Sequence, residues 1–183
     1  MRISLRRSTR TRPGWQSTDM THIWLVGMMG SGKTTVGVLA AQILGLPFVD
    51  TDTVVMESTS RTIDELFAEG EAAFRRAEAE VIASTADAQR SVVATGGGAI
   101  LSAENVAIMS DSGTIVLLQV DAETIAERVD TTAHRPLLGS PGAVARILAD
   151  RLSIYEDVAD HVIATVGRSP REVAMEVTAC VDM

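Results

Sequence analysis

The stretch Gly27–Thr34, GMMGSGKT, decides the fold, because it matches the pattern G-x-x-x-x-G-K-[ST] at every fixed position. A short apolar run at 22–26 precedes it, and a helical pattern at 34–44 follows it. This is the strand-before, helix-after context that a phosphate-binding loop requires. Glycines let successive backbone N–H groups point at one anion, and the helix N-terminus adds partial positive charge. The motif predicts binding of ATP or GTP without saying what receives the phosphate.

Lys33 supports this interpretation by its rarity. Of the sixteen basic residues in the chain, fifteen are arginine, and Lys33 is the single lysine. We expect its compact charge to bind the β- and γ-phosphates, while the Thr34 hydroxyl binds Mg²⁺, which prefers oxygen ligands. The alternative is a glycine-rich strand–helix turn with a surface lysine.

Short apolar runs and helical patterns alternate from residue 22 to the C-terminus. Strands are predicted at 22–26, 47–49, 91–94, 114–120 and 161–164. Helices are predicted at 34–44, 62–69, 71–85, 122–129, 143–152 and 171–181. This alternation predicts an α/β fold whose parallel sheet is covered by helices on both faces. Ligands of such sheets bind at the carboxyl ends of the strands.

Composition and charge exclude several classes of function. The length of 183 residues fits one domain, and the hydrophobic content of 46% is ordinary for a globular protein. Aromatic residues make up 3% and the net charge is −8, which argues against base-stacking modules and general nucleic-acid or anionic-membrane binding. A single cysteine excludes an intrachain disulfide framework, and no run of 18 apolar residues exists to span a membrane.

Residues 1–19 differ from the rest of the chain. They hold five arginines and one acidic residue, so this head carries +4 and the remaining residues −12. It has no apolar periodicity, and we interpret it as a disordered extension. Alternatively, the true first residue is Met20, and the head is not part of the protein. Its Arg-rich, Ser-rich composition is also typical of an organelle transit peptide. Residues 20–183 would form the single domain.

Asp50 and Asp52 follow the second predicted strand, where an acceptor would face the γ-phosphate. We expect both side chains, in an extended segment at the strand end, to line the cleft. Phosphoryl transfer needs a positioned Mg²⁺ and a base for the incoming hydroxyl, and carboxylates can serve both needs. The alternative is a pair of solvated turn carboxylates.

Six motifs, taken in order, resemble those of the shikimate kinases. They are GMMGSGKTTVG (27–37), FVDTD (48–52), FRRAE (74–78), TGGGA (95–99), HRPLL (134–138) and the Arg151-to-Tyr155 spacing. The resemblance runs from about residue 22 to the C-terminus and implies a P-loop kinase fold with a five-stranded parallel sheet. It also implies a mobile lid at about 131–142, and transfer of phosphate from ATP, with Mg²⁺, to the 3-hydroxyl of shikimate.

The resemblance implies a role for each matching residue. Asp52 would bind the acceptor hydroxyl and act as its base, and Asp50 would hold Mg²⁺ through water beside Thr34. The shikimate site would consist of Asp52, Arg75, Gly97 and Arg151. The ATP site would consist of Gly30, Ser31, Gly32, Lys33, Thr34, Thr35, Arg128, Arg135 and Arg168. Catalysis would fall to Lys33, Asp52 and Arg135, the last as a lid cation that neutralises the transferring phosphoryl group.

Alternatives remain for several of these residues. Arg75 could instead be a surface charge paired with Glu71 or Glu78 at helical spacing, and the glycines could form a plain loop. Arg128 and Arg168 could be ordinary surface arginines. Another small-molecule kinase of this fold, such as a gluconate kinase, is the alternative function; a nucleotide-binding module without turnover would lack one of the catalytic residues. We expect a monomeric cytoplasmic enzyme that binds neither nucleic acid nor membrane.

The chain departs from the family pattern at two positions near these motifs. Ser60 stands where glycine is usual, and Ser153 replaces a usual proline. The segment from Arg135 to Arg151 is also a few residues shorter than is common. These departures concern a turn and the lid rather than the reaction.

Overall fold

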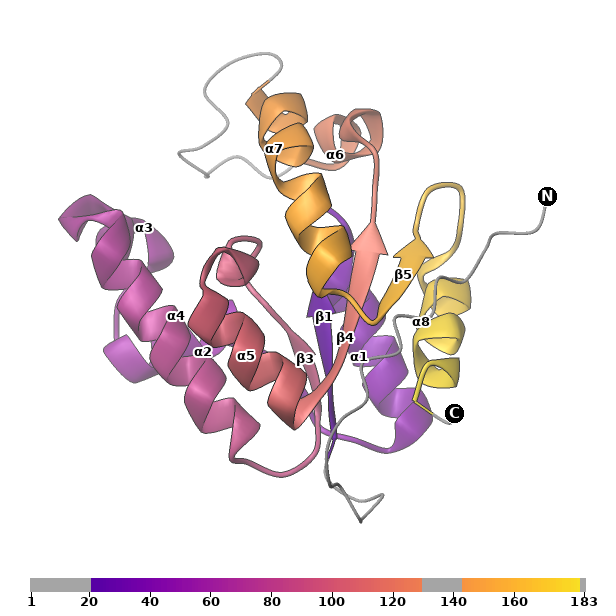
Figure 1. The fold of residues 1–183 in the computed structure, drawn as a ribbon, viewed down its shortest axis with the longest axis horizontal. Helices are drawn as coiled ribbons and strands as arrows, with labels where there is room; N and C mark the ends of the chain where they lie inside the picture. Colours follow the sequence, from indigo (N-terminus) through magenta and orange to yellow (C-terminus); the bar gives the residue numbers. More distant parts are fainter. Residues whose placement is uncertain (1–20, 130–142, 182–183) are drawn as a thin grey trace.

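A computed structural model describes residues 21–129 and 143–181, and its centre is a parallel sheet (Figure 1). The strands are β1 (His22–Val26), β2 (Phe48–Asp50), β3 (Val92–Ala94), β4 (Gly113–Gln119) and β5 (His161–Ala164). Their order across the sheet is β2-β3-β1-β4-β5, and every pairing is parallel. The sequence-based prediction of a five-stranded parallel sheet is confirmed.

Helices connect the strands and cover both faces of the sheet. The α-helices are α1 (Lys33–Leu44), α2 (Thr51–Thr59), α3 (Ile63–Glu69), α4 (Glu71–Ala86), α5 (Ala103–Ser112), α6 (Ala122–Val129), α7 (Ala143–Val158) and α8 (Pro170–Ala179). A short 3₁₀ turn, η1, covers Ala99–Leu101. Figure 1 shows α1 and α8 on one side of the sheet and α4, α5 and α7 on the other. None of the helices in the described ranges is both long and apolar enough to cross a bilayer.

The alternation of side chains along β1 divides the core in two. Trp24 and Val26 pack with residues of α4, α5 and α7, whereas Ile23 and Leu25 pack with α1 and α8. All four side chains are completely buried. A third, smaller cluster joins Val55 of α2 to α3 and α4. The pattern explains why the strand reads as a continuous apolar run, since both faces of a parallel sheet are buried.

Two helices were not anticipated, and one prediction was wrong. The segment after β2 is not extended: Asp50 caps α2, accepting hydrogen bonds from the backbone N–H groups of Asp52 and Thr53. Helix α2 is rich in Thr and Val, which have low intrinsic helix propensity, and it is stabilised by burial of Val55. Helix α5 begins at a Ser102 cap in a stretch to which no element was assigned.

Helix α7 is longer than predicted, ending at Val158 rather than at 152. Ser153 lies inside this helix, where a proline would remove a backbone hydrogen bond and clash with the preceding turn. Serine at this position therefore permits an uninterrupted helix through Tyr155.

Ser60 ends α2 in a left-handed conformation, with φ 54° and ψ 34°. It is the only non-glycine residue with positive φ in the described ranges. An L-residue with a Cβ pays a steric penalty there that glycine does not. This is the physical reason for glycine at the corresponding position of the family pattern.

Ser60→Gly should therefore stabilise the protein by about 0.5–1 kcal/mol, because the relief of strain exceeds the added entropy of the unfolded chain. For a protein of this size the midpoint of thermal unfolding should rise by about 1–4 °C. Ser60→Ala is the matched control, since it removes the hydroxyl but keeps the strain. Equal midpoints for the glycine and alanine variants would contradict the assignment.

Candidate active site

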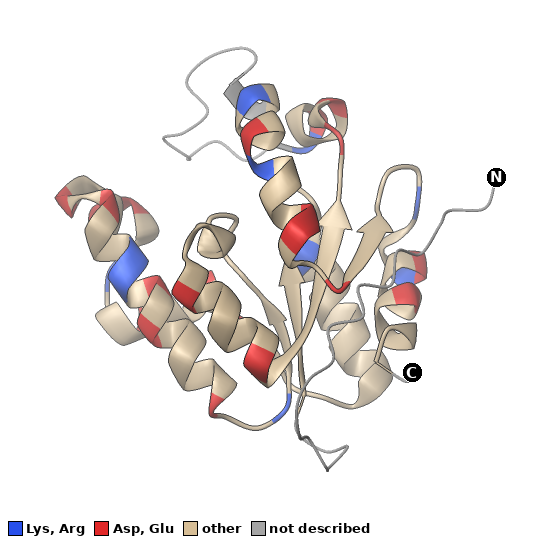
Figure 2. Ribbon diagram, viewed as in Figure 1, with Lys and Arg blue, Asp and Glu red and all other residues tan. Residues whose placement is uncertain are grey.

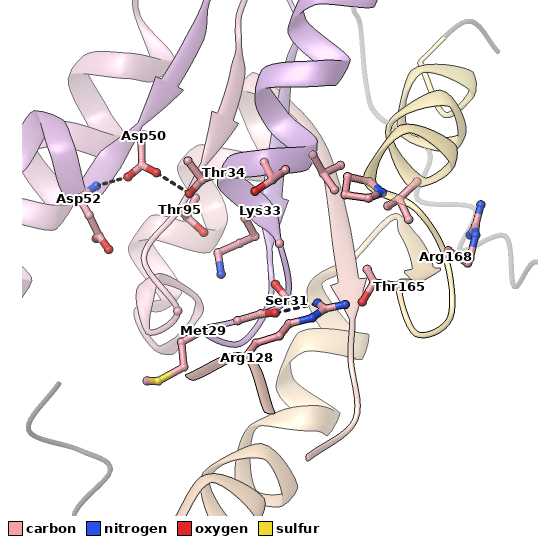
Figure 3. A pocket seen from close by; sticks show the side chains of 17 residues that line it. Met29, Ser31, Lys33, Thr34, Asp50, Asp52, Thr95, Arg128, Thr165 and Arg168 are labelled. Atoms are coloured by element: carbon pink, nitrogen blue, oxygen red, sulfur yellow. Dashed lines mark hydrogen bonds between the residues drawn. The ribbon is translucent and has the colours of Figure 1, made fainter. Parts of the chain in front are cut away.

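Two adjoining cavities open at the carboxyl ends of the strands. The larger, of about 520 Å³, lies over the loop after β1 (Figure 3). The smaller, of about 320 Å³, lies between that loop, α2, α3, α4 and the glycines after β3. Three residues, Met29, Asp52 and Gly97, line both cavities. The arrangement provides two ligand sites with a shared wall.

The larger cavity contains the predicted nucleotide residues that the structure describes. It is lined by Gly30, Ser31, Gly32, Lys33, Thr34, Thr35, Arg128 and Arg168, together with Asp50, Asp52 and Gly97. Arg135 and the expected lid at 131–142 lie outside the described residues. The sequence motif and the structure therefore place the same loop at the centre of the cleft.

Glycine is required in this loop by both backbone angles and close approach. Gly27, Gly30 and Gly32 have φ of 144°, 75° and 94°, values that L side chains rarely adopt. A Cβ on Gly27 would also stand 2.7 Å from the carbonyl oxygen of Leu118 in β4. The loop is therefore held tightly against the sheet, with the N-terminus of α1 directed at the cavity.

Lys33 folds back over the loop that precedes it. Its Nζ donates hydrogen bonds to the carbonyl oxygens of Gly27, at 2.8 Å, and Met28, at 2.9 Å. Ser31 Oγ is buried and has no hydrogen-bond partner among the described residues. A buried hydroxyl of this kind is normally satisfied, and a phosphate oxygen bound in the loop would supply its partner.

Asp50 and Thr34 meet between β2 and α1. The Thr34 hydroxyl donates to Asp50 Oδ2 at 2.9 Å, while Oδ1 of the same carboxylate caps α2 (Figure 3). Two oxygen groups, one hydroxyl and one carboxylate, thus stand together beside the phosphate loop. Their chemistry fits a hard divalent cation such as Mg²⁺.

Two arginines that follow strands β4 and β5 also line the larger cavity. Arg128, in the last turn of α6, donates to the carbonyl oxygen of Gly30 at 2.9 Å. Arg168 lies in the loop after β5, where it pairs with Glu176 at 2.6 Å. Both line the larger cavity, and Arg128 is solvent-exposed there.

The glycines after β3 are packed against charged side chains. A Cβ on Gly96 would stand 2.5 Å from Glu78 Oε1 and 2.9 Å from Asp52 Oδ1, and one on Gly98 would stand 2.5 Å from Arg75 Nη1. Gly96 N–H also donates to the Thr51 hydroxyl at 3.1 Å. The loop is therefore more than a turn, because its lack of side chains lets three charged groups approach the backbone.

Arg75 is both an ion-pair partner and a cavity residue. On α4, where arginines lie among glutamates (Figure 2), its Nη1 donates to Glu78 at 2.7 Å and its Nη2 to Glu71 at 3.0 Å. It also lines the smaller cavity, as do Asp52, Gly97 and Arg151. The sequence analysis treated the ion pairs with glutamate and a place in the acceptor site as alternatives for Arg75. The structure shows the ion pairs, and the same side chain lines the smaller cavity.

Glu78 lines the smaller cavity, although the sequence analysis considered it only as a possible ion-pair partner of Arg75. It has no exposed surface, and burial raises the pKa of its carboxyl group, against which the hydrogen bond from Arg75 acts. A buried charge of this kind needs a partner, and Glu78 in turn fixes the Arg75 guanidinium. Its spacing, three residues after Arg75 in FRRAE, was the available signal.

Tyr155 was part of the Arg151-to-Tyr155 motif but was given no role, and it joins α7 to the glycine loop, the three glycines at 96–98. Its hydroxyl donates to the carbonyl oxygen of Gly97, which also accepts a 3.4 Å bond from Arg151 Nη1. The tyrosine is 1% exposed, and burial raises its pKa to about 12. Tyr155 is therefore a neutral donor at any physiological pH, and it fixes Gly97 and the helix that carries Arg151.

Comparison with known proteins gives a consistent result over the whole described domain. The family profile described as Shikimate kinase matches residues 29–182. The shikimate kinase of Symbiobacterium thermophilum is 43% identical over 85% of this chain and 93% of its own length. That of Streptomyces coelicolor is 42% identical over 88% of this chain and 95% of its own.

Solved structures show the same likeness. The structure of shikimate kinase from Acinetobacter baumannii in complex with shikimate has a TM-score of 0.84 and 34% identity, covering 88% of this chain and 93% of that one. A gluconokinase from Sinorhizobium meliloti has a TM-score of 0.57 and 21% identity, covering 88% of this chain and 91% of that one. The second comparison shows a shared fold alone.

Gly98→Ala tests the close approach of Arg75 to the glycine loop. Gly98 has φ −110° and ψ 0°, which alanine adopts without strain, so the added methyl group acts only by displacing the guanidinium. The KM for a carboxylate-bearing acceptor such as shikimate should rise about tenfold, with that for ATP little changed. The double variant with Arg75→Ala should be no worse than Arg75→Ala alone, because both changes remove one interaction. Additive losses in steady-state kinetics would contradict this.

Proposed function

The chain belongs to the shikimate kinase family, and from that premise we propose that its two cavities carry out transfer of the γ-phosphoryl group of ATP to the 3-hydroxyl of shikimate. It is a kinase by family, fold and phosphate-binding loop. The observation that supports the assignment of acceptor is the smaller cavity, whose lining combines Arg75, Arg151 and Asp52 with the glycines after β3. Shikimate has both groups that such a site would recognise, a carboxylate and a ring hydroxyl.

The larger cavity is proposed to hold ATP. Backbone N–H groups of Gly30, Ser31 and Gly32 and the hydroxyls of Thr34 and Thr35 would surround the phosphates. Lys33 would leave the loop carbonyls and bind the β- and γ-phosphates. Arg128 and Arg168 would contact the rest of the nucleotide, since both line the same cavity beyond the loop.

Thr34 and Asp50 are proposed to hold Mg²⁺, Asp50 through water. Their 2.9 Å contact beside the phosphate loop and their oxygen chemistry support this. When bound, the ion would neutralise phosphate charge as transfer proceeds. Asp50 also caps α2, so the same carboxylate would link the position of the ion to the helix that carries Asp52.

The acceptor is proposed to bind through its carboxylate to Arg75 and Arg151. The two arginines come from different helices, α4 and α7, and both line the smaller cavity. A planar guanidinium pairs bidentately with a carboxylate, which explains arginine at both positions. Gly97 would donate its backbone N–H to the acceptor.

Asp52 is proposed to be the catalytic base. It lies in the first turn of α2 and lines both cavities, so it stands where a hydroxyl in one would approach a phosphate in the other. The hydroxyl oxygen would form a bond to the γ-phosphorus as the bond to the bridging oxygen of ADP breaks. The proton of the hydroxyl would pass to the Asp52 carboxylate.

Three further expectations rest on the sequence resemblance. Arg135, outside the described residues, is proposed to neutralise the transferring phosphoryl group. The monomeric state and cytoplasmic location also stay predictions of the resemblance. Residues 1–19 also lie outside the described ranges, and that they are dispensable stays a prediction from their lack of apolar periodicity.

A panel of acceptors tests the proposed function directly. In a coupled assay of ADP release with ATP and Mg²⁺, we expect turnover with shikimate and none with gluconate or nucleoside monophosphates. Gluconate also carries a carboxylate and hydroxyls, but the likeness of this chain to a gluconokinase is at 21% identity and concerns the fold. Turnover of gluconate in place of shikimate would overturn the proposal.

Asp52→Asn should lower kcat by about 10²–10⁴-fold, because the amide has the same size but is a far weaker base. The affinity for ATP, measured by titration of a nonhydrolysable analogue, should stay nearly unchanged. Full activity of the variant would assign the base elsewhere, with Asp50 the next candidate.

Arg75→Ala and Arg151→Ala should each raise the KM for shikimate about tenfold or more, since a charge-assisted hydrogen bond contributes roughly 1.5–3 kcal/mol. The KM for ATP should change little. Lysine at either position should restore affinity only in part, because an ammonium group cannot form the bidentate pair. An equal rise in both Michaelis constants would indicate a structural role.

A further inference from the structure

We propose that Glu71 is a stand-in for the carboxylate of the acceptor: it binds the Nε–Nη2 edge of Arg75 until the acceptor displaces it, and it thereby sets the affinity for anionic acceptors. The inference rests on the proposed function, because it takes Arg75 as the group that binds the acceptor carboxylate. It adds a residue outside the cavity lining whose side chain competes with the substrate for one edge of a guanidinium.

The contacts of Arg75 leave few positions for an incoming carboxylate. Glu71 Oε1 accepts from both Nε, at 3.2 Å, and Nη2, at 3.0 Å, so one carboxylate oxygen occupies the two donors with which a carboxylate ligand would form a bidentate pair. Nη1 donates to Glu78 at 2.7 Å. The backbone of Gly98 lies against the guanidinium at its two terminal nitrogens. A bidentate bond to the acceptor is therefore gained most readily at the edge that Glu71 occupies.

Burial decides which of the two glutamates can give way. The Glu78 side chain is 1% exposed, and its release from Arg75 would leave a buried carboxylate without a countercharge. The Glu71 side chain is 64% exposed at the first residue of α4, so it can turn into water at little cost. Glu78 thus keeps Arg75 in place while Glu71 is exchanged.

The charges of the smaller cavity favour such an exchange. Its lining holds three carboxylates, Asp52, Asp64 and Glu78, and two guanidinium groups, Arg75 and Arg151. A bound acceptor adds a further negative charge to this set. If Glu71 turns away as the acceptor enters, its carboxylate leaves Arg75 and the carboxylate of the acceptor takes its place. The number of negative charges beside the guanidinium then stays the same.

Glu71→Gln tests the exchange because the two roles that Glu71 could have predict opposite signs. If Glu71 competes with the acceptor, removing its charge should lower the dissociation constant of shikimate about two- to fivefold at low ionic strength, the range of an exposed ion pair. If Glu71 instead positions Arg75, the same variant should bind shikimate more weakly. The measurement is calorimetric titration of shikimate without nucleotide.

Two controls separate exchange from general electrostatics. Glu80→Gln removes the same charge from an exposed position further along α4 and should leave the dissociation constant within error. The methyl ester of shikimate has no carboxylate to displace Glu71, so its affinity should be equal for the native protein and for Glu71→Gln. Tighter binding in Glu71→Gln should therefore be confined to the acid, and the advantage should diminish at high salt.

Three results would overturn the proposal. They are weaker or unchanged binding of the acid by Glu71→Gln, equal tightening for acid and ester, and an equal effect of Glu80→Gln. A native protein that fails to bind shikimate would overturn the proposed function as well, and the coupled assay of ADP release distinguishes that case. Native turnover of shikimate with any of the three results would refute the stand-in role alone.

Discussion

The parallel pairing of β1 with both β3 and β4 is the constraint on which the site depends. Leu25 is in register with Ala94 on one side and Val116 on the other, so loops far apart in sequence begin at the same edge of the sheet. The phosphate loop after β1 therefore meets the three glycines after β3, and Asp50 arrives beside them because β2 pairs with β3. Because all the pairings are parallel, each strand ends at the same edge of the sheet, and the polar residues that follow it lie there.

Charge in the smaller cavity is organised around an ion pair whose glutamate is buried and whose arginine is partly exposed. Arg75 and Glu78 lie one turn apart on α4, and the glutamate is fully buried. A buried ion pair is weak evidence of stability, since desolvation offsets much of the attraction. Its effect here is geometric: the glutamate holds one terminal nitrogen, Gly98 supports the guanidinium, and the exposed partner Glu71 remains exchangeable. The neighbours of the Arg75 guanidinium thus hold it in one orientation, which under the proposed function would preorganise it for a carboxylate ligand.

Sequence predicted the sheet well because its strands are short apolar runs stopped by glycine or aspartate. All five were placed to within about a residue at each end, and the described nucleotide residues lie in one cavity, as the P-loop pattern predicts. Helix α2 was missed because its Thr and Val residues suit strands, whereas the Asp50 cap and the packing of Val55 stabilise the helix. Glu78 and Tyr155 were not predicted as site residues, because periodicity does not reveal contacts between residues far apart in sequence. Glu78 lies against Gly96, 18 residues away, and Tyr155 donates to Gly97, 58 residues away.

Gly97 is the point where these features meet, because it belongs to the wall that the two cavities share. A Cβ there would stand 3.5 Å from the Gly27 carbonyl oxygen, 3.6 Å from the Met29 nitrogen and 3.7 Å from the Tyr155 hydroxyl oxygen. The residue is thus enclosed by the phosphate loop on one side and by α7 on the other, and the buried tyrosine fixes its carbonyl group. A reaction between ligands in adjoining cavities needs their separation held constant to a fraction of an ångström. The hydrogen bonds that Tyr155 and Arg151 donate to the Gly97 carbonyl group hold this part of the shared wall in place.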